Sequence, residues 1–247
     1  MRHIIQLALV ACAAAPAAGR TQAPPRRVSY GVEVAFRSGH ADRGFLISDR
    51  AVIQPVSWLG WRGTELSLWG SVPLSPNTDG SRPHIAEFEL ARADTLGTVT
   101  IAPALRMYFY HDALSRERDR SLEGWLNLSI DLGAFSVFVT PSLDLLTYQG
   151  AYFIDSGLES ERHITARLEL GGSLRAGWAS WRFNDEYAGV PKSTLDRVSA
   201  EGWLTAYLTT NLYIAPHVEY NVTVDSDVRA VTGPHYLLLR VGLGGEF

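Results

Sequence analysis

The chain has 247 residues and a formal net charge of −4, from 22 lysine and arginine residues against 26 aspartate and glutamate residues. This balance excludes the basic footprint that nucleic-acid binding needs, so no nucleic-acid partner is expected, and the length suits one domain of about 200 to 250 residues. Cys12 is the only cysteine, so the chain has no internal disulfide and no cysteine-based metal site.

The first residues have the pattern of a secretory signal peptide. Arg2 gives a positive start, an apolar run covers Ile4–Ala15, and small residues follow. A membrane-spanning helix needs about 20 apolar residues, and this run is shorter. We therefore expect a cleaved signal peptide at 1–19, a short N-terminal segment at 20–27 and one folded domain at 28–247.

From residue 28 onward, apolar and polar side chains alternate with a period of two, which is typical of strands with one apolar face. Val32 and Val34, for example, flank Glu33. The pattern predicts twelve strands, at 28–37, 51–61, 65–74, 86–90, 98–109, 125–132, 135–145, 150–159, 164–178, 203–208, 211–223 and 236–247.

The segment 164–178 keeps a single phase throughout, with Ile164, Leu168 and Trp178 on the same parity. Gly171-Gly172 does not shift that phase. We therefore predict one long strand with a glycine kink, not a hairpin.

Short and long connections alternate along the chain. Short ones are predicted near 62–63, 94–97, 133, 159–162 and 209–210, and long ones near 38–49, 75–83, 110–121, 184–197 and 225–234. Outer-membrane barrels have short turns on the periplasmic side and long loops outside, and an even strand number brings both termini to the same side.

These features favour an all-β fold: a single antiparallel transmembrane β-barrel of about 12 strands in the outer membrane of a Gram-negative cell. The alternative is a secreted β-sandwich. Strands of about 10 residues suit a tilted membrane crossing, whereas soluble strands average about 5–6. Aromatic residues near strand ends predict an interfacial girdle; they are Trp58, Trp61, Tyr108, Tyr110, Tyr148, Tyr152, Trp178, Trp181 and Tyr236.

The C-terminus resembles the signal that outer-membrane barrels present to their assembly machinery. Leu239, Val241 and Leu243 share the phase of the terminal Phe247, although Gly245 stands where an aromatic residue is usual. The partners expected are outer-membrane lipid and lipopolysaccharide, the barrel assembly machinery and periplasmic chaperones.

Three prolines oppose a regular barrel. Pro103, Pro141 and Pro216 fall inside predicted strands, where each removes a hydrogen-bond donor from the ladder. We expect bulges at these positions, or shorter strands.

Several short segments resemble the TorF family of porin-like barrels. They are Arg43-Gly44-Phe45, Asp49-Arg50, Gln54-Pro55, Leu68-Trp69-Gly70 and Gly150-Ala151-Tyr152-Phe153. The resemblance implies a barrel with a channel role and an exposed Arg-Gly segment ahead of the Gln-Pro strand. It implies no catalytic residues.

The polar parity of the strands defines the candidate site. If the apolar parity faces lipid, the lumen is lined by Glu33, Glu87, Glu89, Arg106, Asp131, Asp144, Arg167, Glu169, Arg175, His217, Glu219 and Arg240. Interleaved charges favour a passive channel for small polar solutes. The alternatives are a structural or adhesive barrel with a lumen plugged by ion pairs and, more weakly, a lipid-modifying enzyme.

For the enzyme hypothesis, His217, Glu219 and Asn221 share one strand face. Outer-membrane lipid hydrolases act at the outer surface, so a polar lumen patch explains this trio better. The sequence has no metal-binding or phosphate-loop motif, so we expect no metal, no cofactor and no enzyme.

Overall fold

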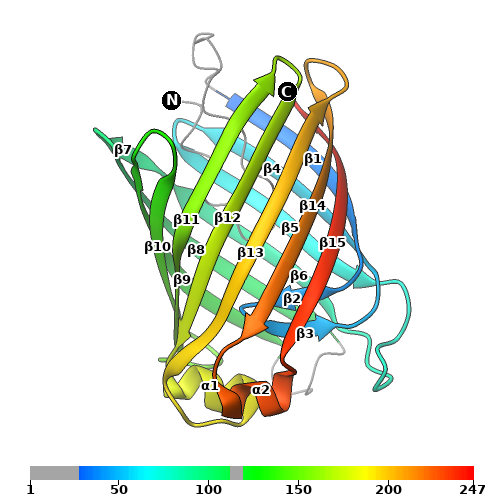
Figure 1. Ribbon diagram of the computed structural model, residues 1–247, viewed down its shortest axis with the longest axis vertical. Helices are drawn as coiled ribbons and strands as arrows, with labels where there is room; N and C mark the ends of the chain where they lie inside the picture. Colours follow the sequence, from blue (N-terminus) through cyan, green and yellow to red (C-terminus); the bar gives the residue numbers. More distant parts are fainter. Residues whose placement is uncertain (1–27, 112–118) are drawn as a thin grey trace.

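Twelve antiparallel strands close into a barrel in the computed structural model, which describes residues 28–111 and 119–247 (Figure 1). The strands of the ring are β1 (Val28–Arg37), β4 (Val52–Trp61), β5 (Thr64–Pro73), β6 (His84–Arg92), β8 (Val99–His111), β9 (Arg120–Asp131), β10 (Ser136–Asp144), β11 (Tyr152–Thr165), β12 (Leu168–Ala179), β13 (Thr194–Tyr207), β14 (Leu212–Thr223) and β15 (His235–Glu246). Successive ring strands pair with each other, and the pairing of β1 with β15 closes the ring. Closure removes sheet edges, which lets a sheet exist where no water can satisfy its backbone. The predicted twelve-stranded barrel is confirmed; the predicted signal peptide lies outside the described residues.

Three short strands and two helices complete the structure. β7 (Asp94–Leu96) follows β6 and pairs with the beginning of β8. β2 (His40–Asp42) and β3 (Phe45–Ser48) form a separate hairpin. The helices are α1 (Trp181–Ala188) and α2 (Ser226–Thr232). Among the described residues, no helix has the length and apolar character needed to cross a membrane.

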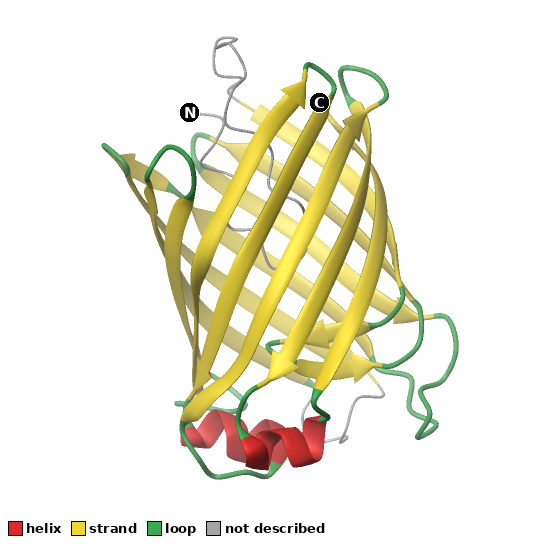
Figure 2. Ribbon diagram, in the orientation of Figure 1, coloured by secondary structure: helices red, strands yellow, loops and turns green. Residues whose placement is uncertain are grey.

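The two ends of the barrel differ in their connections (Figure 2). The turn rim carries the short turns between ring strands, together with the start of β1 and the end of β15. The loop rim carries the long connections, with the β2–β3 hairpin, α1 and α2. This is the alternation of short and long connections that the sequence predicts.

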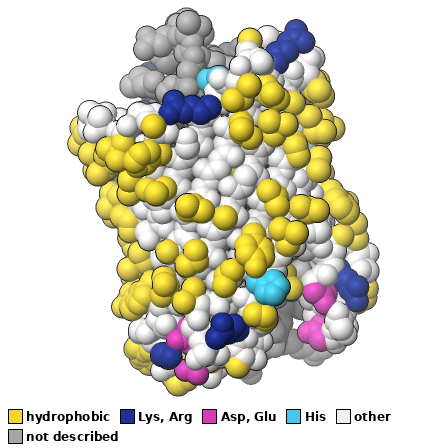
Figure 3. Space-filling view, viewed as in Figure 1, with side chains coloured by type: hydrophobic (Ala, Val, Ile, Leu, Met, Phe, Trp, Pro, Cys, Tyr) yellow, Lys and Arg dark blue, Asp and Glu magenta, His cyan; other side chains and the backbone are white. Residues whose placement is uncertain are grey.

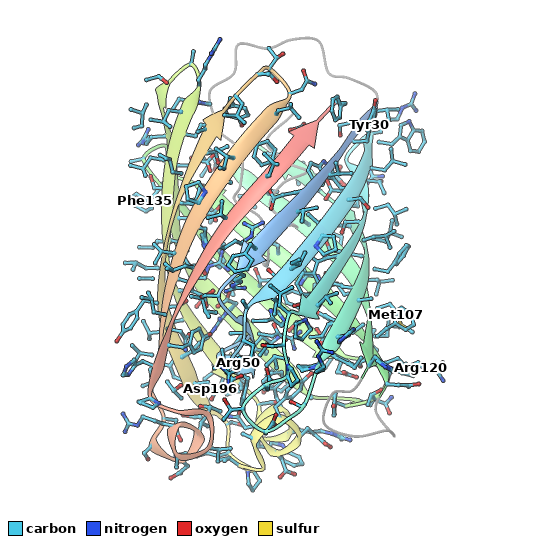
Figure 4. The ribbon with its side chains drawn as sticks, turned by 90° about the vertical axis from the view of Figure 1, so that its right-hand side faces the viewer. Tyr30, Arg50, Met107, Arg120, Phe135 and Asp196 are labelled. Atoms are coloured by element: carbon cyan, nitrogen blue, oxygen red, sulfur yellow. The ribbon has the colours of Figure 1, made fainter. Side chains whose placement is uncertain are left out.

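Side chains alternate between the outer and inner faces of the wall. On β1, Val32 and Val34 are 56% and 54% exposed, whereas Glu33 between them is 3% exposed. Figure 3 shows hydrophobic side chains over the wall and charged side chains mainly near its two ends. In Figure 4, Tyr30 and Phe135 likewise lie on the outer surface. An apolar surface of this extent suits hydrocarbon and is disfavoured in water.

The strand prolines cause neither the bulges nor the shortening that we expected. Pro103, Pro141 and Pro216 lie within β8, β10 and β14. Each interrupts only one of its strand's two ladders, and the register is the same on both sides of the gap. The β9–β10 ladder, for example, stops at Val139 and resumes at Ser142. The missing donor opens a gap in one ladder. The gap stays local, because the ladder on the opposite side still holds the strand in place.

A turn at 166–167 divides the segment 164–178, which the sequence analysis interpreted as one strand. β11 ends at Thr165, and the expected connection at 159–162 lies inside β11. Because the register shifts between His163 and Thr165, odd-numbered residues face the lumen in both β11 and β12, and even-numbered residues face outward in both. The alternation therefore passes through the turn without changing phase, which conceals the turn in the sequence.

The predicted aromatic girdle is only partly correct. Trp61 and Trp181 are 54% and 55% exposed. Tyr108 is buried inside the barrel and stacks on Tyr110 with ring centroids 5.9 Å apart, a separation typical of aromatic pairs. The Trp58 ring lies over Gly31 on the inner wall, where an added Cβ would lie 2.1 Å from the ring. Position near a strand end therefore does not decide which way an aromatic side chain faces.

Candidate site in the barrel lumen

Most of the predicted lumen residues point into the barrel. Those placed inside, with little or no exposure, are Glu33, Glu87, Glu89, Arg106, Asp144, Glu169, Arg175, His217, Glu219 and Arg240. Two members of the set are placed differently. Arg167 is exposed in the turn between β11 and β12, because the strand predicted there is two strands, and Asp131 is exposed at the turn-rim end of β9.

A first group of charges lies where β1, β14 and β15 adjoin. Arg37 pairs with Glu219, and Arg240 pairs with Glu33. The Tyr213 hydroxyl donates to Glu33 Oε2 at 2.9 Å. Buried charges are tolerated only when paired, and each of these four charges has a partner. Both pairs join strands that lie close together along the wall.

A second group spans β11 to β14. Arg175 Nη1 lies 3.2 Å from Asp155 Oδ2, and its Nε lies 3.1 Å from Glu201 Oε1. Asp155 Oδ1 also lies 3.2 Å from Arg197 Nη2. His217 Nε2 lies 3.4 Å from Glu201 Oε2. Each carboxylate thus faces two basic groups, and the group again follows the wall.

A third group lies on β6, β8 and β9. Arg106 pairs with Glu89, and its Nε lies 3.6 Å from Glu87 Oε1. The same guanidinium lies 3.9 Å from the centre of the Trp125 ring, a cation–π distance. Trp125 Nε1 donates to Glu123 Oε2 at 2.9 Å. Glu123 is 1% exposed, so its charge needs a partner.

That partner comes from the β2–β3 hairpin, which folds into the barrel near the loop rim (Figure 1). Arg43 and Gly44 form its two-residue turn, with φ of 49° and 95°. The Arg43 guanidinium pairs with Glu123 on β9. On the other side, an added Cβ on Gly44 would lie 3.3 Å from Arg197 Cδ on β13. The hairpin tip therefore bridges two parts of the wall. The resemblance to porin-like barrels implied an exposed Arg-Gly segment; here Arg43 is 6% exposed, because it is docked inside.

Apolar contacts hold the hairpin as well. Phe45 belongs to a buried group at the loop rim, which we call the mouth cluster: Phe45, Ala151, Phe153, Ala179, Phe183 and Val228. Ile47 packs both on this cluster and on the inner-wall group of Val56, Trp69, Ile85 and Tyr108. The loop-rim end of the lumen is thus filled by the hairpin and by apolar side chains from the wall and helices.

Helix α1 is positioned to contribute to the mouth cluster. The Ser180 side chain caps it by accepting from Phe183 N at 3.2 Å, and Gly189 ends it with φ of 68°, a conformation that favours glycine. Phe183 is 1% exposed and stacks on Tyr187 with centroids 4.3 Å apart. The helix thereby presents an aromatic face to the hairpin tip.

His40, at the start of the hairpin, is held neutral. Burial and then the nearby Arg37 charge lower the pKa of His40 to about 3, against a smaller opposing effect of Asp42. The Gln54 amide lies 3.2 Å from Nδ1 and donates to it, because a neutral ring nitrogen can accept. Docking of the hairpin therefore does not depend on His40 titration between pH 5 and 8.

At the loop rim, Lys192, in the loop that follows α1, forms ion pairs with residues at the start of α2. Its Nζ lies 2.7 Å from Asp225 Oδ2 and 3.0 Å from Asp227 Oδ2. Asp225 also caps α2 by accepting from Asp227 N and Val228 N, and accepts from Thr194 Oγ1 at 3.1 Å. The hydrogen bond from Lys192 is the largest influence that lowers the pKa of Asp225, to about 2.

We expect the order of α2 to be lost in acid. Because the folded pKa of Asp225 lies below its unfolded value of about 3.9, its contribution is complete above about pH 5 and is lost as the pH falls through about 2. Amide protection factors of residues 226–232 should stay constant from about pH 7 to about pH 5 and then fall. Asp225→Asn keeps a capping oxygen without the charge and should flatten this profile; an unchanged profile would contradict the assignment.

The lumen residues outside the predicted set include Asp155, Arg197 and Arg43. Asp155 lies on a strand with irregular alternation. Arg197 was placed in a loop because it follows buried Asp196, where a register shift in β12–β13 pairing breaks the alternation. Arg43 was missed because only the folded chain shows which wall its loop contacts.

The trio considered for catalysis is divided among different partners. His217 faces Glu201, and Glu219 pairs with Arg37. Neither side-chain polar atom of Asn221 has a hydrogen-bond partner among the described residues. These contacts do not connect the three in a relay. In the described ranges, no group of three His, Cys, Asp or Glu side chains is arranged to hold a metal ion.

The barrel architecture is found in solved structures. The NanC porin superposes with a TM-score of 0.56 at 16% identity, covering 87% of this chain and 98% of that one. The KdgM porin gives 0.52 at 11% identity, covering 89% and 99%. The chain has the fold of these porins. The translocator domain of the autotransporter NalP from Neisseria meningitidis also matches, with 0.50 at 9% identity over 91% of this chain and 90% of that domain. At such low identity the likeness concerns the fold alone. No protein-family model and no curated protein sequence matches the chain.

Proposed function

We propose that the protein is an outer-membrane, porin-like channel for small polar solutes whose loop-rim mouth is closed, in this conformation, by the β2–β3 hairpin. The observation that carries the proposal is the arrangement of the lumen charges. The ion pairs between strands join neighbours or next neighbours along the wall. They follow the wall without crossing the barrel, and near the mouth the hairpin bridges two parts of the wall.

The apolar outer wall supports residence in a membrane, and the porin fold and the short segments that resemble TorF-family barrels support the outer membrane of a Gram-negative cell. The exposed, in-phase side chains of Leu239, Val241, Leu243 and Phe247 on and after β15 are available to the barrel assembly machinery during insertion. We also propose lipopolysaccharide, outer-membrane lipid and periplasmic chaperones as partners.

Planar-bilayer recording of the refolded protein tests the channel. We expect rare openings of the wild type and frequent, larger openings when the hairpin tip is freed by Phe45→Ser, which removes its anchor in the mouth cluster. Leu46→Ser, next to it and 40% exposed, is the matched control and should behave as the wild type. Absence of current steps at any voltage in all three proteins would contradict the channel.

A plugged structural barrel is the second candidate, and the mouth cluster favours it, because Phe153 and Phe183 are 2% and 1% exposed. On this alternative the hairpin never leaves its site. The same recordings separate the two: silent wild-type and Phe45→Ser proteins, both correctly folded, would favour the plug.

Selectivity for cations is expected from Glu65 when its carboxyl group is ionised. This residue on β5 is 3% exposed, and neither carboxylate oxygen has a hydrogen-bond partner among the described residues. An unpaired buried carboxylate attracts a cation or a proton. Glu65→Gln should lower the cation-to-anion permeability ratio about two- to five-fold, equivalent to about 0.4–1 kcal/mol. Ser67→Ala on the same face is the control. An unchanged reversal potential in a salt gradient would contradict this role.

A further inference from the structure

The groups around the Arg43 guanidinium form a complete cation site. Glu123 accepts from it, and the Tyr108 hydroxyl lies 3.5 Å from Nη2. The guanidinium carbon lies 5.0 Å from the Trp125 ring centre, 5.4 Å from Phe183 and 6.0 Å from Phe153. A carboxylate together with aromatic faces is the environment that a planar guanidinium prefers. We call these five residues the guanidinium cage.

The cage belongs to the wall and α1, whereas its occupant belongs to the hairpin. Glu123 is held from the side by Trp125 Nε1 at 2.9 Å, and Phe183 is fixed by its stack on Tyr187. These supports do not involve Arg43. When the hairpin leaves, a buried carboxylate and three aromatic faces are left open to the lumen, and an unpaired buried charge is costly.

The occupant is held in an unfavourable backbone conformation. Arg43 has φ of 49°, a region that residues other than glycine seldom adopt. The same two-residue Arg-Gly turn occurs at Arg62-Gly63, with φ of 50° and 83°. There the arginine lies at the turn rim, over Trp61 at 5.2 Å. The two turns share their backbone and differ in the surroundings of the arginine side chain.

We propose that the guanidinium cage is a binding subsite for solutes that carry a guanidinium group, and that Arg43 occupies it as an internal substitute for them. The proposal rests on the channel function for its physiological meaning, since the solute would meet the cage on its way through the open mouth. Its chemistry rests on the contacts of Arg43 alone. A solute guanidinium that replaces Arg43 restores the charge pairing of Glu123 while the hairpin is displaced.

The test removes the internal occupant and adds a free one. Arg43→Asn deletes the guanidinium and suits the left-handed turn; Arg62→Asn makes the same change in the matched turn. The probe is ethylguanidinium at millimolar concentration, with ethylammonium for comparison. We expect ethylguanidinium to raise the Tm of refolded Arg43→Asn in a saturable manner and to leave the wild type and Arg62→Asn unchanged. Ethylammonium should bind more weakly, because it lacks the planar fork.

Glu123→Gln added to Arg43→Asn should weaken the apparent Kd of ethylguanidinium about tenfold or more, as expected for a lost charged hydrogen bond. Arg43→Gln, which keeps a long polar side chain, replaces Arg43→Asn if that variant does not fold. No saturable stabilisation of either variant would overturn the proposal, and equal stabilisation by ethylammonium would overturn the guanidinium class.

Bilayer recording separates this site from the channel itself. If Arg43→Asn conducts, ethylguanidinium should reduce its current with the same concentration dependence as the Tm. If it is silent while the Tm still rises, the channel function fails and the guanidinium cage stands. If it conducts and neither its current nor its Tm responds, the channel stands and the cage fails.

Discussion

Val139→Arg should prevent stable membrane assembly, whereas Thr140→Arg should be tolerated. Val139 lies in the middle of β10, is 37% exposed and faces outward. Thr140 faces the lumen, where its hydroxyl accepts from Asn127 Nδ2 at 2.8 Å. An arginine that faces the centre of the bilayer lowers the free energy of unfolding by about 2–4 kcal/mol. The lumen side offers polar neighbours to the same side chain.

The pair of substitutions is informative because the two positions are adjacent in one strand. Both variants would be refolded into phospholipid vesicles and unfolded with guanidinium chloride, with heat-dependent gel mobility as a check of assembly. A difference of at least about 2 kcal/mol in favour of Thr140→Arg is expected. Equal losses would mean that the two faces of β10 are not distinguished by lipid.

Arg175→Met should be the most destabilising single change in the lumen. Arg175 lies 3.2 Å from Asp155 and 3.1 Å from Glu201, and its guanidinium lies 5.2 Å from the Phe138 ring centre. Removing one partner of a buried pair costs about 3–5 kcal/mol, because the remaining charge stays buried. Arg197 still pairs with Asp155 at 3.2 Å, whereas Glu201 keeps the longer contact of 3.4 Å with His217. Glu201 therefore bears most of the loss, because a histidine is charged only when it is protonated.

Equilibrium unfolding again gives the measurement, with Arg92→Met as the control. The Arg92 side chain is 59% exposed and pairs with Asp94, which is 65% exposed, so its loss should change the stability little because water screens this pair. Adding Glu201→Gln to Arg175→Met should recover part of the lost stability. If Arg175→Met is as stable as Arg92→Met, the charges of the second group do not stabilise the barrel.

The alternation of side chains was sufficient to predict the ring of strands and the facing of most lumen residues. It works because the outer face of each strand is apolar and its inner face is polar. On β1, for example, Val32 is exposed on the outer face and Glu33 is buried on the inner face. Where the backbone departs from simple pairing, the pattern fails. The register shift near His163 concealed a turn, and the shift opposite Arg197 made strand residues resemble a loop.

The closure of the lumen could not be predicted from the sequence. Arg43 lies in a segment that alternation defines only as a long connection, and its partner Glu123 is 80 residues away in the chain. Neither the direction in which the hairpin folds nor the wall that it meets leaves a local signal. Aromatic residues show the same limit: Tyr108 and Trp61 are both near strand ends, yet one is buried inside and the other is exposed.

A nitroxide scan of β5 tests most directly whether the two faces of the wall meet different surroundings. Residues 28–247 contain no cysteine, so single cysteines at 66, 67, 68, 71 and 72 can be labelled one at a time in the refolded barrel. Labels at Leu66, Leu68 and Val72 should collide with oxygen dissolved in the bilayer, and labels at Ser67 and Ser71 should be shielded from it. Oxygen accessibility without this alternation would contradict a wall with one side in hydrocarbon and the other around a polar lumen.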